Sequence, residues 1–376
     1  MRKVVNTKIV IAWILPILCI CNGHGMSNKK IIDLLLSEPD KELDVLSCEK
    51  DWEWQFDYAT ILEIDDKYVM YYRAVNFKRF PYQTYCRVTS LDGIHWEREN
   101  VCKFNYEGST DNNIITDRID GVSVAYVDGI YWLIADRRWD ENNKLVRGML
   151  MFKSTDGVNF EQYDNFKVPY YCDSQNEILW DKTSKTFKIY LRSWYKCQNP
   201  MIDYHHTHKC YRSVSLLEIP NLDYTMPLNP SAFYLTGKTE PPSICEELSV
   251  VLQNMSLSED FDIYCAYVNK YRKSLYIAYP INYYHTDDKS RGGKLDNDGY
   301  GTIGFWTSKD GRVFKEVKRD YITNGNKWIE SCVGHVETKD MFIHYYIPFN
   351  NTHEERALKN TIRARIHYKN KKWKNR

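Results

Sequence analysis

The sequence predicts an all-β fold, a five-bladed β-propeller with four antiparallel strands in each blade. Three observations carry this prediction. A Ser-x-Asp-Gly motif occurs three times, at 90–93, 154–157 and 308–311. Each copy follows a strand-like run, and hairpins of one kind recur along the chain at a spacing of about 65 residues. After removal of an N-terminal signal, the chain has room for about five such units.

The motif predicts a tight turn. Glycine accepts the positive φ that such turns require, and aspartate and serine side chains can accept hydrogen bonds from nearby backbone N–H groups. An aromatic residue follows each copy, namely Trp96, Phe160 and Phe314. One Asp-Gly turn is weak evidence, but three copies in matching context indicate a repeat architecture.

Five hairpins can be counted along the chain. They pair 58–64 with 68–73, 122–127 with 130–135, 178–181 with 187–192, 263–268 with 275–279, and 335–337 with 342–346. A third strand follows each hairpin, at 84–89, 148–153, 211–216, 302–307 and 361–367. The Ser-x-Asp-Gly turn then closes units one, two and four. A pair of β-sandwiches would not explain why the same turn recurs at the same place in each unit.

Residues 1–25 predict an export signal rather than a part of the fold. Three basic residues precede an apolar run over 9–20 that is short for a membrane span. We therefore expect an exported protein, periplasmic, extracellular or at the cell surface, without a transmembrane span after signal removal. Two cysteines near the end of the signal leave a lipoprotein anchor open. Residues 26–48 are expected to be a lead-in and 49–376 the propeller.

The composition narrows the choice of partners. The net charge is +1, so the overall balance indicates no nucleic-acid partner. Aromatic residues make up 15% of the chain, which suits both sheet packing and sugar-stacking surfaces. The chain has 11 cysteines but no CxxC pair, so a zinc site is not expected. Cys197 and Cys210 are the best candidates for a disulfide, and the oligomeric state stays open.

Acidic residues stand before the first strand of every unit. They are Glu53 and Asp57, Asp117 and Asp120, Asp173 and Glu177, Asp260 and Asp262, and, in the last unit, Glu330. Because the innermost strands of a propeller converge near its axis, these carboxylates are expected to meet at one pocket. Like charges in such a pocket raise the pKa of one carboxyl group, which leaves one acid and one ionised base. Glycosidic bond cleavage needs this pair.

Basic residues end several second strands on the same side. They are Arg73, Arg137, Arg138 and Arg192. Arginine can pair with the acids or clamp a hydroxyl or carboxylate of a substrate. A structural bridge between blades is the alternative for each of them.

The order of these motifs resembles the five-bladed β-propeller glycoside hydrolases of the fructosidase and arabinofuranosidase–xylosidase type, and specifically an exported bacterial branch. The segments that carry the likeness are 52–53, 71–73, 90–96, 108, 112–114, 173–176, 180–181, 190–192, 298–299 and 308–311. They span nearly the whole chain after the signal, in the same order. The likeness is a more specific indication of fold than of activity, because the propeller hosts many chemistries.

The resemblance implies three carboxylates: a nucleophile or base in the first blade, an orienting aspartate in the second and an acid in the third. They fall on Glu53, with Asp57 less favoured; on Asp120, with Asp117 in reserve; and on Asp173, with Glu177 in reserve. Glu330 is an alternative acid. Substrate-binding residues are expected to be Asp57, Arg73, Arg137, Asn176, Arg192 and Asp262. The Asn-Asp-Pro, Arg-Asp-Pro and Glu-Cys-Pro motifs of the best-known families are absent.

Neither a metal nor a cofactor is expected. His205, His206 and His208 lie in a loop-like stretch, where a pocket rim is a better interpretation than a ligand set. A sialidase-like hydrolase is an alternative, since related turns close sialidase propellers and the arginines at 73, 137 and 192 could form a triad. Sialidase repeats carry one more residue between Asp and Gly, which all three copies here lack.

The sequence therefore predicts an exported glycoside hydrolase, exo-acting on a terminal sugar by carboxylate acid/base catalysis. A non-catalytic carbohydrate-binding propeller is the main alternative, with the same acids and aromatic residues holding sugar hydroxyls. The expected partner is a carbohydrate in both cases. Substitution of the acids at 53, 120, 173 and 330 separates the two hypotheses, because a hydrolase would lose turnover and keep binding.

Overall fold

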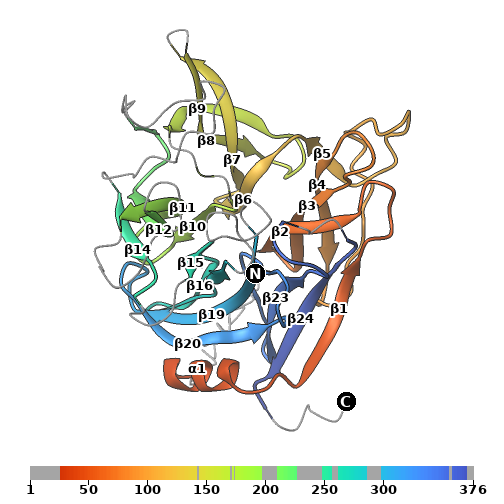
Figure 1. Cartoon of the computed structure of the whole chain (residues 1–376). Helices are drawn as coiled ribbons and strands as arrows, with labels where there is room; N and C mark the ends of the chain where they lie inside the picture. Colours follow the sequence, from red (N-terminus) through yellow and green to blue (C-terminus); the bar gives the residue numbers. More distant parts are fainter. Residues whose placement is uncertain are drawn as a thin grey trace, which may run out of the picture.

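The fold is known from a computed structural model that describes residues 26–141, 144–169, 172, 174–196, 210–226, 248–255, 261–285, 298–354 and 358–370. Within these residues the polypeptide forms five sheets around one axis, with a short helix at the edge (Figure 1). The five-bladed β-propeller predicted from the repeat is thus confirmed.

Each of the first three blades begins with its innermost strand. Blade 1 consists of β2 (Gln55–Ile64), β3 (Lys67–Val75), β4 (Gln83–Ser90) and β5 (Ile114–Asp117). Blade 2 consists of β6 (Asp120–Val127), β7 (Ile130–Glu141), β8 (Lys144–Ser154) and β9 (Glu161–Val168), with the short β13 (Tyr224–Thr225) parallel to β9. Blade 3 consists of β10 (Glu177–Asp181), β11 (Thr186–Lys196), β12 (Cys210–Ile219) and β14 (Ser249–Leu252).

The inner strands of the last two blades are interrupted. Blade 4 has β15 (Asp262–Ile263) and β16 (Val268–Arg272), then β17 (Leu275–Ala278) and β18 (Ile281–Tyr284), then β19 (Tyr300–Ser308) and β20 (Phe314–Thr323). Blade 5 has β21 (Ile329–Ser331) and β22 (Val336–Glu337), then β23 (Met341–Pro348) and β24 (Thr361–Tyr368). Pro280 separates β17 from β18, because proline has no N–H to donate to the ladder.

β1 (Lys41–Ser47) closes the ring as the outer strand of blade 5. It runs antiparallel to β24, with Lys41 opposite Ile366 and Ser47 opposite Thr361. Figure 1 shows the orange-red β1 beside the blue β24. The segment expected to be a lead-in, 26–48, therefore supplies one strand of the propeller.

The helix α1 (Asn28–Leu36) precedes β1 and packs on blade 4. Ser27 caps it by accepting a hydrogen bond from the backbone N–H of Lys30, and its buried residues are Ile31 and Leu35. Tyr321 of β20 donates to the backbone oxygen of Leu35 at 2.6 Å. No helix of the described part is long and apolar enough to cross a membrane.

The three Ser-x-Asp-Gly turns have one geometry. The serine Oγ accepts from the glycine N–H at 2.9–3.0 Å. The aspartate Oδ1 accepts from the two backbone N–H groups after the glycine at 2.7–3.1 Å. The glycine φ is 75°, 71° and 73° in turn. The left-handed conformation and the side-chain bonds expected from the motif are therefore both present.

A tyrosine of the preceding blade holds each of these turns. The hydroxyl of Tyr345 donates to Gly93 O at 2.5 Å, that of Tyr71 to Gly157 O at 2.8 Å and that of Tyr190 to Gly311 O at 2.9 Å. A Cβ on Gly157 would come 2.5 Å from the Tyr71 hydroxyl. Glycine is thus needed for close approach as well as for its φ, and the repeated motif is a contact between blades.

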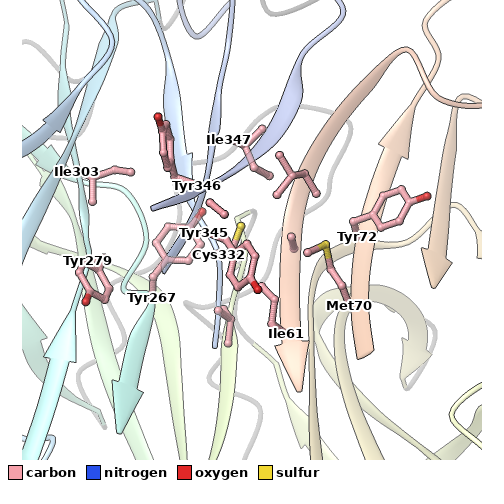
Figure 2. Close-up of a cluster of buried hydrophobic side chains, with 14 of the residues drawn as sticks. Ile61, Met70, Tyr72, Tyr267, Tyr279, Ile303, Cys332, Tyr345, Tyr346 and Ile347 are labelled. Carbon is pink, nitrogen blue, oxygen red and sulfur yellow. The ribbon is translucent and has the colours of Figure 1, made fainter. Parts of the chain in front are cut away.

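Apolar side chains fill the spaces between neighbouring blades. Separate clusters lie between blades 1 and 2, 2 and 3, and 3 and 4, and the largest joins blades 4, 5 and 1. Figure 2 shows part of the largest, with Ile61 and Met70 from blade 1, Tyr279 from blade 4, and Cys332 and Tyr345 from blade 5. Much of the high aromatic content is therefore core, where flat rings pack well between twisted sheets.

Hydrogen bonds close the axis between its two ends. Gln175 Nε2 donates to Ala59 O at 3.2 Å and to Val122 O at 3.1 Å. The Val333 N–H donates to Ala59 O at 2.9 Å. We call the end where the first strands begin the entrance end. At the opposite end, residues of all five blades line a cavity of about 390 Å³.

Candidate active site

The entrance end gathers the acids that precede or begin the first strands. Among the described residues these are Asp57, Asp120, Glu177, Asp262 and Glu330, at or within two positions of the starts of β2, β6, β10, β15 and β21. A parallel bridge between Thr60 and Val333 shows that the inner strands of blades 1 and 5 run in the same direction. The starts of the first strands consequently lie at the same end of the ring.

Arg73 joins two of these acids. Its Nε and Nη2 donate to the two carboxylate oxygens of Asp57, each at 2.6 Å, and its Nη1 donates to Asp120 Oδ1 at 2.5 Å. The two-pronged pair arises because Arg73 on β3 stands directly opposite Asp57 on β2. Burial alone would lower the pKa of Arg73, but Asp120 and Asp57 outweigh it and hold that pKa well above its usual value.

Asp120 is the accessible member of this group. Its side chain is 34% exposed, whereas those of Arg73 and Asp57 are 7% and 1% exposed. Its Oδ1 accepts both the Arg73 bond and the backbone N–H of Gly121 at 2.9 Å. Its Oδ2 has no hydrogen-bond partner among the described residues. Asp120 therefore presents one positioned carboxylate oxygen to a ligand.

Tyr58 supports the guanidinium from its ring face. The Arg73 Cζ lies 4.2 Å from the centre of the Tyr58 ring, and burial raises the pKa of the Tyr58 hydroxyl well above its usual value. Tyr58 has a φ of 49° at a register shift in β2. The bulge lets adjacent residues of one strand, Asp57 and Tyr58, both contact the same arginine.

Glu330 is enclosed in blade 5. It is fully buried, its Oε1 accepts from the indole N–H of Trp328 at 2.9 Å, and its Oε2 lies 3.5 Å from the Tyr58 backbone nitrogen. The structure thus brings Glu330 beside Tyr58 but not to the surface. Its predicted role as an acid stays a prediction.

Glu53 lies on the other face of β3 from Arg73. Its Oε1 accepts from the Tyr72 hydroxyl at 2.6 Å and from Arg98 Nε at 2.9 Å, and its Oε2 accepts from Arg98 Nη2 at 2.8 Å. Successive side chains of a strand point to opposite faces, so Tyr72 and Arg73 diverge. The Glu53 side chain is 0% exposed. These contacts anchor the segment that precedes β2. They give no support to the catalytic role predicted for Glu53.

Blade 3 contributes amides and a buried acid. Asn176 Oδ1 accepts from the Arg192 backbone N–H at 2.8 Å, and its Nδ2 donates to Cys172 O at 2.8 Å, so this predicted substrate ligand is occupied by backbone groups. Glu177 Oε2 accepts from the Val268 N–H at 2.6 Å. Burial raises the pKa of Glu177 well above its usual value, and the side chain is almost fully enclosed.

The predicted ligands in blade 4 and beside it are held by other residues. Asp262 is fully buried, and its Oδ2 accepts from Arg212 Nη1 at 2.7 Å and lies 3.1 Å from His285 Nε2. Arg192 is buried and donates from Nε and Nη2 to Tyr264 O, both at 3.0 Å. Both residues therefore form contacts between blades 3 and 4.

Arg137 is placed differently from the other two arginines. It follows Asp136, which stands opposite Asp120 in the β6–β7 register, and its Nη1 donates to the backbone oxygen of Arg118. No carboxylate of the described residues lies within ion-pair distance of it. Burial lowers the pKa of Arg137 from its usual value, although Asp117 and other nearby carboxylates oppose this. Arg73, Arg137 and Arg192 thus have separate partners, which gives no support to a sialidase-like triad.

Several predicted residues lie outside the described residues. They are Asp173, Asp260, the three histidines at 205, 206 and 208, and Cys197. No group of acids, histidines and cysteines in the described part of the chain could hold a metal ion. Asp136 was not among the sequence candidates, yet its two carboxylate oxygens accept from Arg147 Nε at 3.0 and 2.8 Å, and its Oδ2 also accepts from Arg147 Nη2. In the sequence, Asp136 could have been noticed as an acid at the position on the second strand of blade 2 that Arg73 occupies in blade 1.

Comparison with known proteins places the fold. No protein-family model matches the sequence, and neither does any curated protein. The solved structure of a complex of BT0996 with RGII has a TM-score of 0.54 at 12% identity and covers 90% of this chain and 95% of its own. A second, named a glycoside hydrolase, has a TM-score of 0.54 at 12% identity, with 90% and 94% covered. A Bombyx mori GH32 β-fructofuranosidase, BmSUC1, has a TM-score of 0.50 at 12% identity, with 85% and 61% covered.

The protein therefore shares its fold with five-bladed β-propeller glycoside hydrolases. The likeness covers most of the chain, as the sequence resemblance implied. At this level of identity it establishes the fold alone, because one fold hosts many activities. Function has to be argued from the residues at the entrance end.

Proposed function

We propose that the protein is a glycoside hydrolase that acts on the terminal sugar of an oligo- or polysaccharide, with Asp120 in contact with the substrate. One observation carries the proposal. The entrance end holds an accessible carboxylate, Asp120, that is fixed by Arg73, which is itself fixed by the buried Asp57. A carboxylate positioned in this way before any substrate arrives suits base or nucleophilic chemistry at a sugar carbon.

A second carboxyl group must protonate the leaving oxygen. The sequence assigns this role to Asp173, and we keep that proposal. Burial raises the pKa of Glu177 well above its usual value, but its side chain is almost fully enclosed, so we do not assign it this role. In this mechanism Asp120 is the base or nucleophile, and Asp57 and Arg73 act by holding it in place.

Arg137 is proposed to bind the substrate. It has no carboxylate partner in the described structure, and Asp120 and Asp117 contribute to its electrostatic surroundings. A guanidinium that is partly desolvated and has no carboxylate partner gains most from binding a sugar hydroxyl or carboxylate.

Action on a chain end is supported by the closure of the axis. The bonds from Gln175 and Val333 to Ala59 join the inner strands below the entrance end, so a polysaccharide cannot thread through the ring. The terminal sugar of a polymer can approach an end of the ring that is closed below it. We also propose that the enzyme works outside the cytoplasm, from the export signal predicted at residues 1–25.

A non-catalytic carbohydrate-binding propeller remains the second candidate. One observation favours it: Asp57, Asp262 and Glu330 are all fully or almost fully buried. Among the described acids at or before the first-strand starts, only Asp120 and Asp117 then have partly exposed side chains, 34% and 29%, and binding a sugar requires no more than that.

The two candidates are separated by a screen with matched variants. The panel contains aryl glycosides, rhamnogalacturonan II oligosaccharides and fructans, and released sugars are identified by chromatography. The wild type is expected to release a monosaccharide, and Asp120→Asn should lower the rate by about 10² to 10⁴. The control Asp128→Asn changes an exposed turn residue at the far end of β6 and should keep the wild-type rate. Binding without release by the wild type would favour the binding module.

A further inference from the structure

The loop between β3 and β4 displays three aromatic rings to solvent. Phe77, Phe80 and Tyr82 are 52%, 57% and 56% exposed. Among the exposed large hydrophobic side chains of the described residues these are the only aromatic ones, and the others are aliphatic residues scattered over the molecule. Aromatic side chains elsewhere in the described blades are largely packed between sheets, so this gathering needs its own explanation.

The loop is held in shape by bonds at its base. The Asn76 N–H donates to Tyr82 O at 2.9 Å, and Asn76 Nδ2 donates to Asp51 O at 2.6 Å. Arg79 reaches Asp51 at 3.3 Å and Glu107 at 3.1 Å. The rings of Phe80 and Tyr82 meet edge to face, with their centres 6.1 Å apart. The rings of Phe80 and Tyr82 are therefore held against each other, which reduces the entropy that a ligand would have to remove.

The loop adjoins the entrance end. It begins three residues after Arg73, at the end of β3. The guanidinium of Arg118 lies 5.1 Å from the centre of the Phe80 ring, and the backbone oxygen of Arg118 accepts from Arg137. Arg118 is two residues before Asp120. Arg118 thus connects the segment that carries Asp120 with the aromatic loop.

We propose that loop 76–82 is a second carbohydrate-binding surface, which holds the sugar units that follow the terminal one. This rests on the proposed function in one respect, namely that the terminal sugar lies at Asp120. Aromatic rings present flat apolar faces to the C–H faces of sugar rings, and the neighbouring Arg118 and Arg79 can donate to sugar hydroxyls. Flat rings with charged donors between them fit an oligosaccharide better than they fit an apolar protein surface, which is closely packed and excludes charge.

The test uses the full-length protein with Phe77→Ala, Phe80→Ala and Tyr82→Ala combined. Affinity for the polysaccharides and oligosaccharides of the panel is measured by affinity electrophoresis and titration calorimetry in the Asp120→Asn background, where hydrolysis is strongly slowed. The triple variant should bind the polymers roughly tenfold to hundredfold more weakly. Leu91→Ala and Val313→Ala together remove exposed side chains at two Ser-x-Asp-Gly turns and should keep the full affinity. Phe80→Trp, which keeps a stacking face, should also keep it.

Kinetics with active enzyme separate this inference from the proposed function. The triple variant is expected to raise KM for the polymers and to leave kcat/KM for an aryl glycoside unchanged. If polymer affinity and KM are unchanged, loop 76–82 is not a carbohydrate-binding surface, and the proposed hydrolase function is unaffected. If the triple variant loses polymer binding and the wild type cleaves none of the substrates, the binding surface is supported and the hydrolase function is rejected. Loss of self-association or of binding to phosphatidylglycerol vesicles, with polymer affinity intact, would assign the rings to another partner and overturn the inference.

Discussion

At the scale of single residues, Arg73 determines the charge arrangement of the entrance end. It is buried, it uses three donors on two carboxylates, and it rests on the ring of Tyr58. Asp57 is equally buried and depends on this arginine for compensation. A buried ion pair contributes little compared with a well-packed apolar pair, but removal of one partner is costly, because the other charge stays without a counter-ion.

Arg73→Ala should therefore destabilise the fold by about 3–5 kcal/mol, because it leaves the Asp57 carboxylate buried and unpaired. The free energy of unfolding in urea measures this. Arg79→Ala is the matched control: Arg79 also contacts two carboxylates, but its side chain is 46% exposed. Its loss should cost no more than about 1 kcal/mol. Equal costs for the two variants would contradict the role given to Arg73.

The residue scale also shows where sequence reasoning stops. The acidic character of the strand starts was visible in the sequence, and the structure places Asp57, Asp120, Glu177, Asp262 and Glu330 at them. The partners of these acids were not visible in the sequence. Glu53 and Asp57 stand four residues apart, yet Glu53 contacts Arg98 and Asp57 contacts Arg73, on opposite sides of β3. Which acid stays accessible depends on contacts between blades, and no local pattern encodes those.

At the scale of elements, the Ser-x-Asp-Gly turn connects two strands and also joins two neighbouring blades. Its serine and aspartate satisfy the turn's own N–H groups, and its glycine oxygen accepts from a tyrosine of the preceding blade. The repeat predicted the turn and its spacing. The tyrosine lies far away in the sequence, so the contact between blades could be seen only in the structure.

Gly157→Ala is expected to destabilise more than Gly129→Ala. Both glycines have a positive φ, 71° and 83°, so both variants carry the strain of about 1–2 kcal/mol that a side chain meets there. A Cβ at 129 meets nothing within 4 Å, whereas one at 157 comes 2.5 Å from the Tyr71 hydroxyl and 2.8 Å from Tyr131. Thermal unfolding midpoints compare the two, and equal shifts would show that the close approach of Tyr71 does not matter.

Tyr71→Phe tests this contact between blades without adding atoms. It removes the hydroxyl that donates to Gly157 O at 2.8 Å and keeps the buried ring. The loss should lie near 1 kcal/mol, with the carbonyl left unsatisfied. Urea unfolding is the measurement. Tyr126→Phe changes a partly buried tyrosine of β6 for which the described structure gives no hydroxyl bond, and it should be close to neutral.

At the scale of the whole molecule, the ring depends on β1. The blade count could be predicted from the repeat, but the origin of the last strand could not, because β1 carries none of the repeat's motifs and pairs with a strand more than 300 residues away. Five similar sheets close only when the outer edge of blade 5 is paired. The unpaired edge of β24 would otherwise invite association between molecules.

A truncated protein that begins at Cys48 should accordingly unfold at a lower temperature and aggregate. The matched control begins at Asp40: it lacks α1 but keeps β1 and the bond from the Asp40 N–H to Ile366 O at 2.8 Å. The control should lose much less stability. Thermal unfolding and light scattering compare the two proteins, and equal midpoints would show that β1 does not close the ring.

Histidines of blade 5 give the whole fold a pH dependence. Burial lowers the pKa of His335 to about 4 and that of His344 well below its usual value. In the unfolded chain both titrate near about 6.5, so the unfolded state binds more protons as the pH falls from about 6.5 toward 4, and the free energy of unfolding decreases. Urea midpoints across that range measure the slope. It should be smaller in a His335→Gln, His344→Gln variant.

The central claim is that the entrance end binds the terminal sugar against Asp120. A crystal structure of the Asp120→Asn variant with an oligosaccharide that the wild type cleaves tests it most directly. We expect a sugar ring within about 3.2 Å of the residue 120 side chain and in contact with Arg137, with further sugar units toward loop 76–82. A sugar bound only in the cavity at the opposite end of the axis, or at a blade edge, would contradict it.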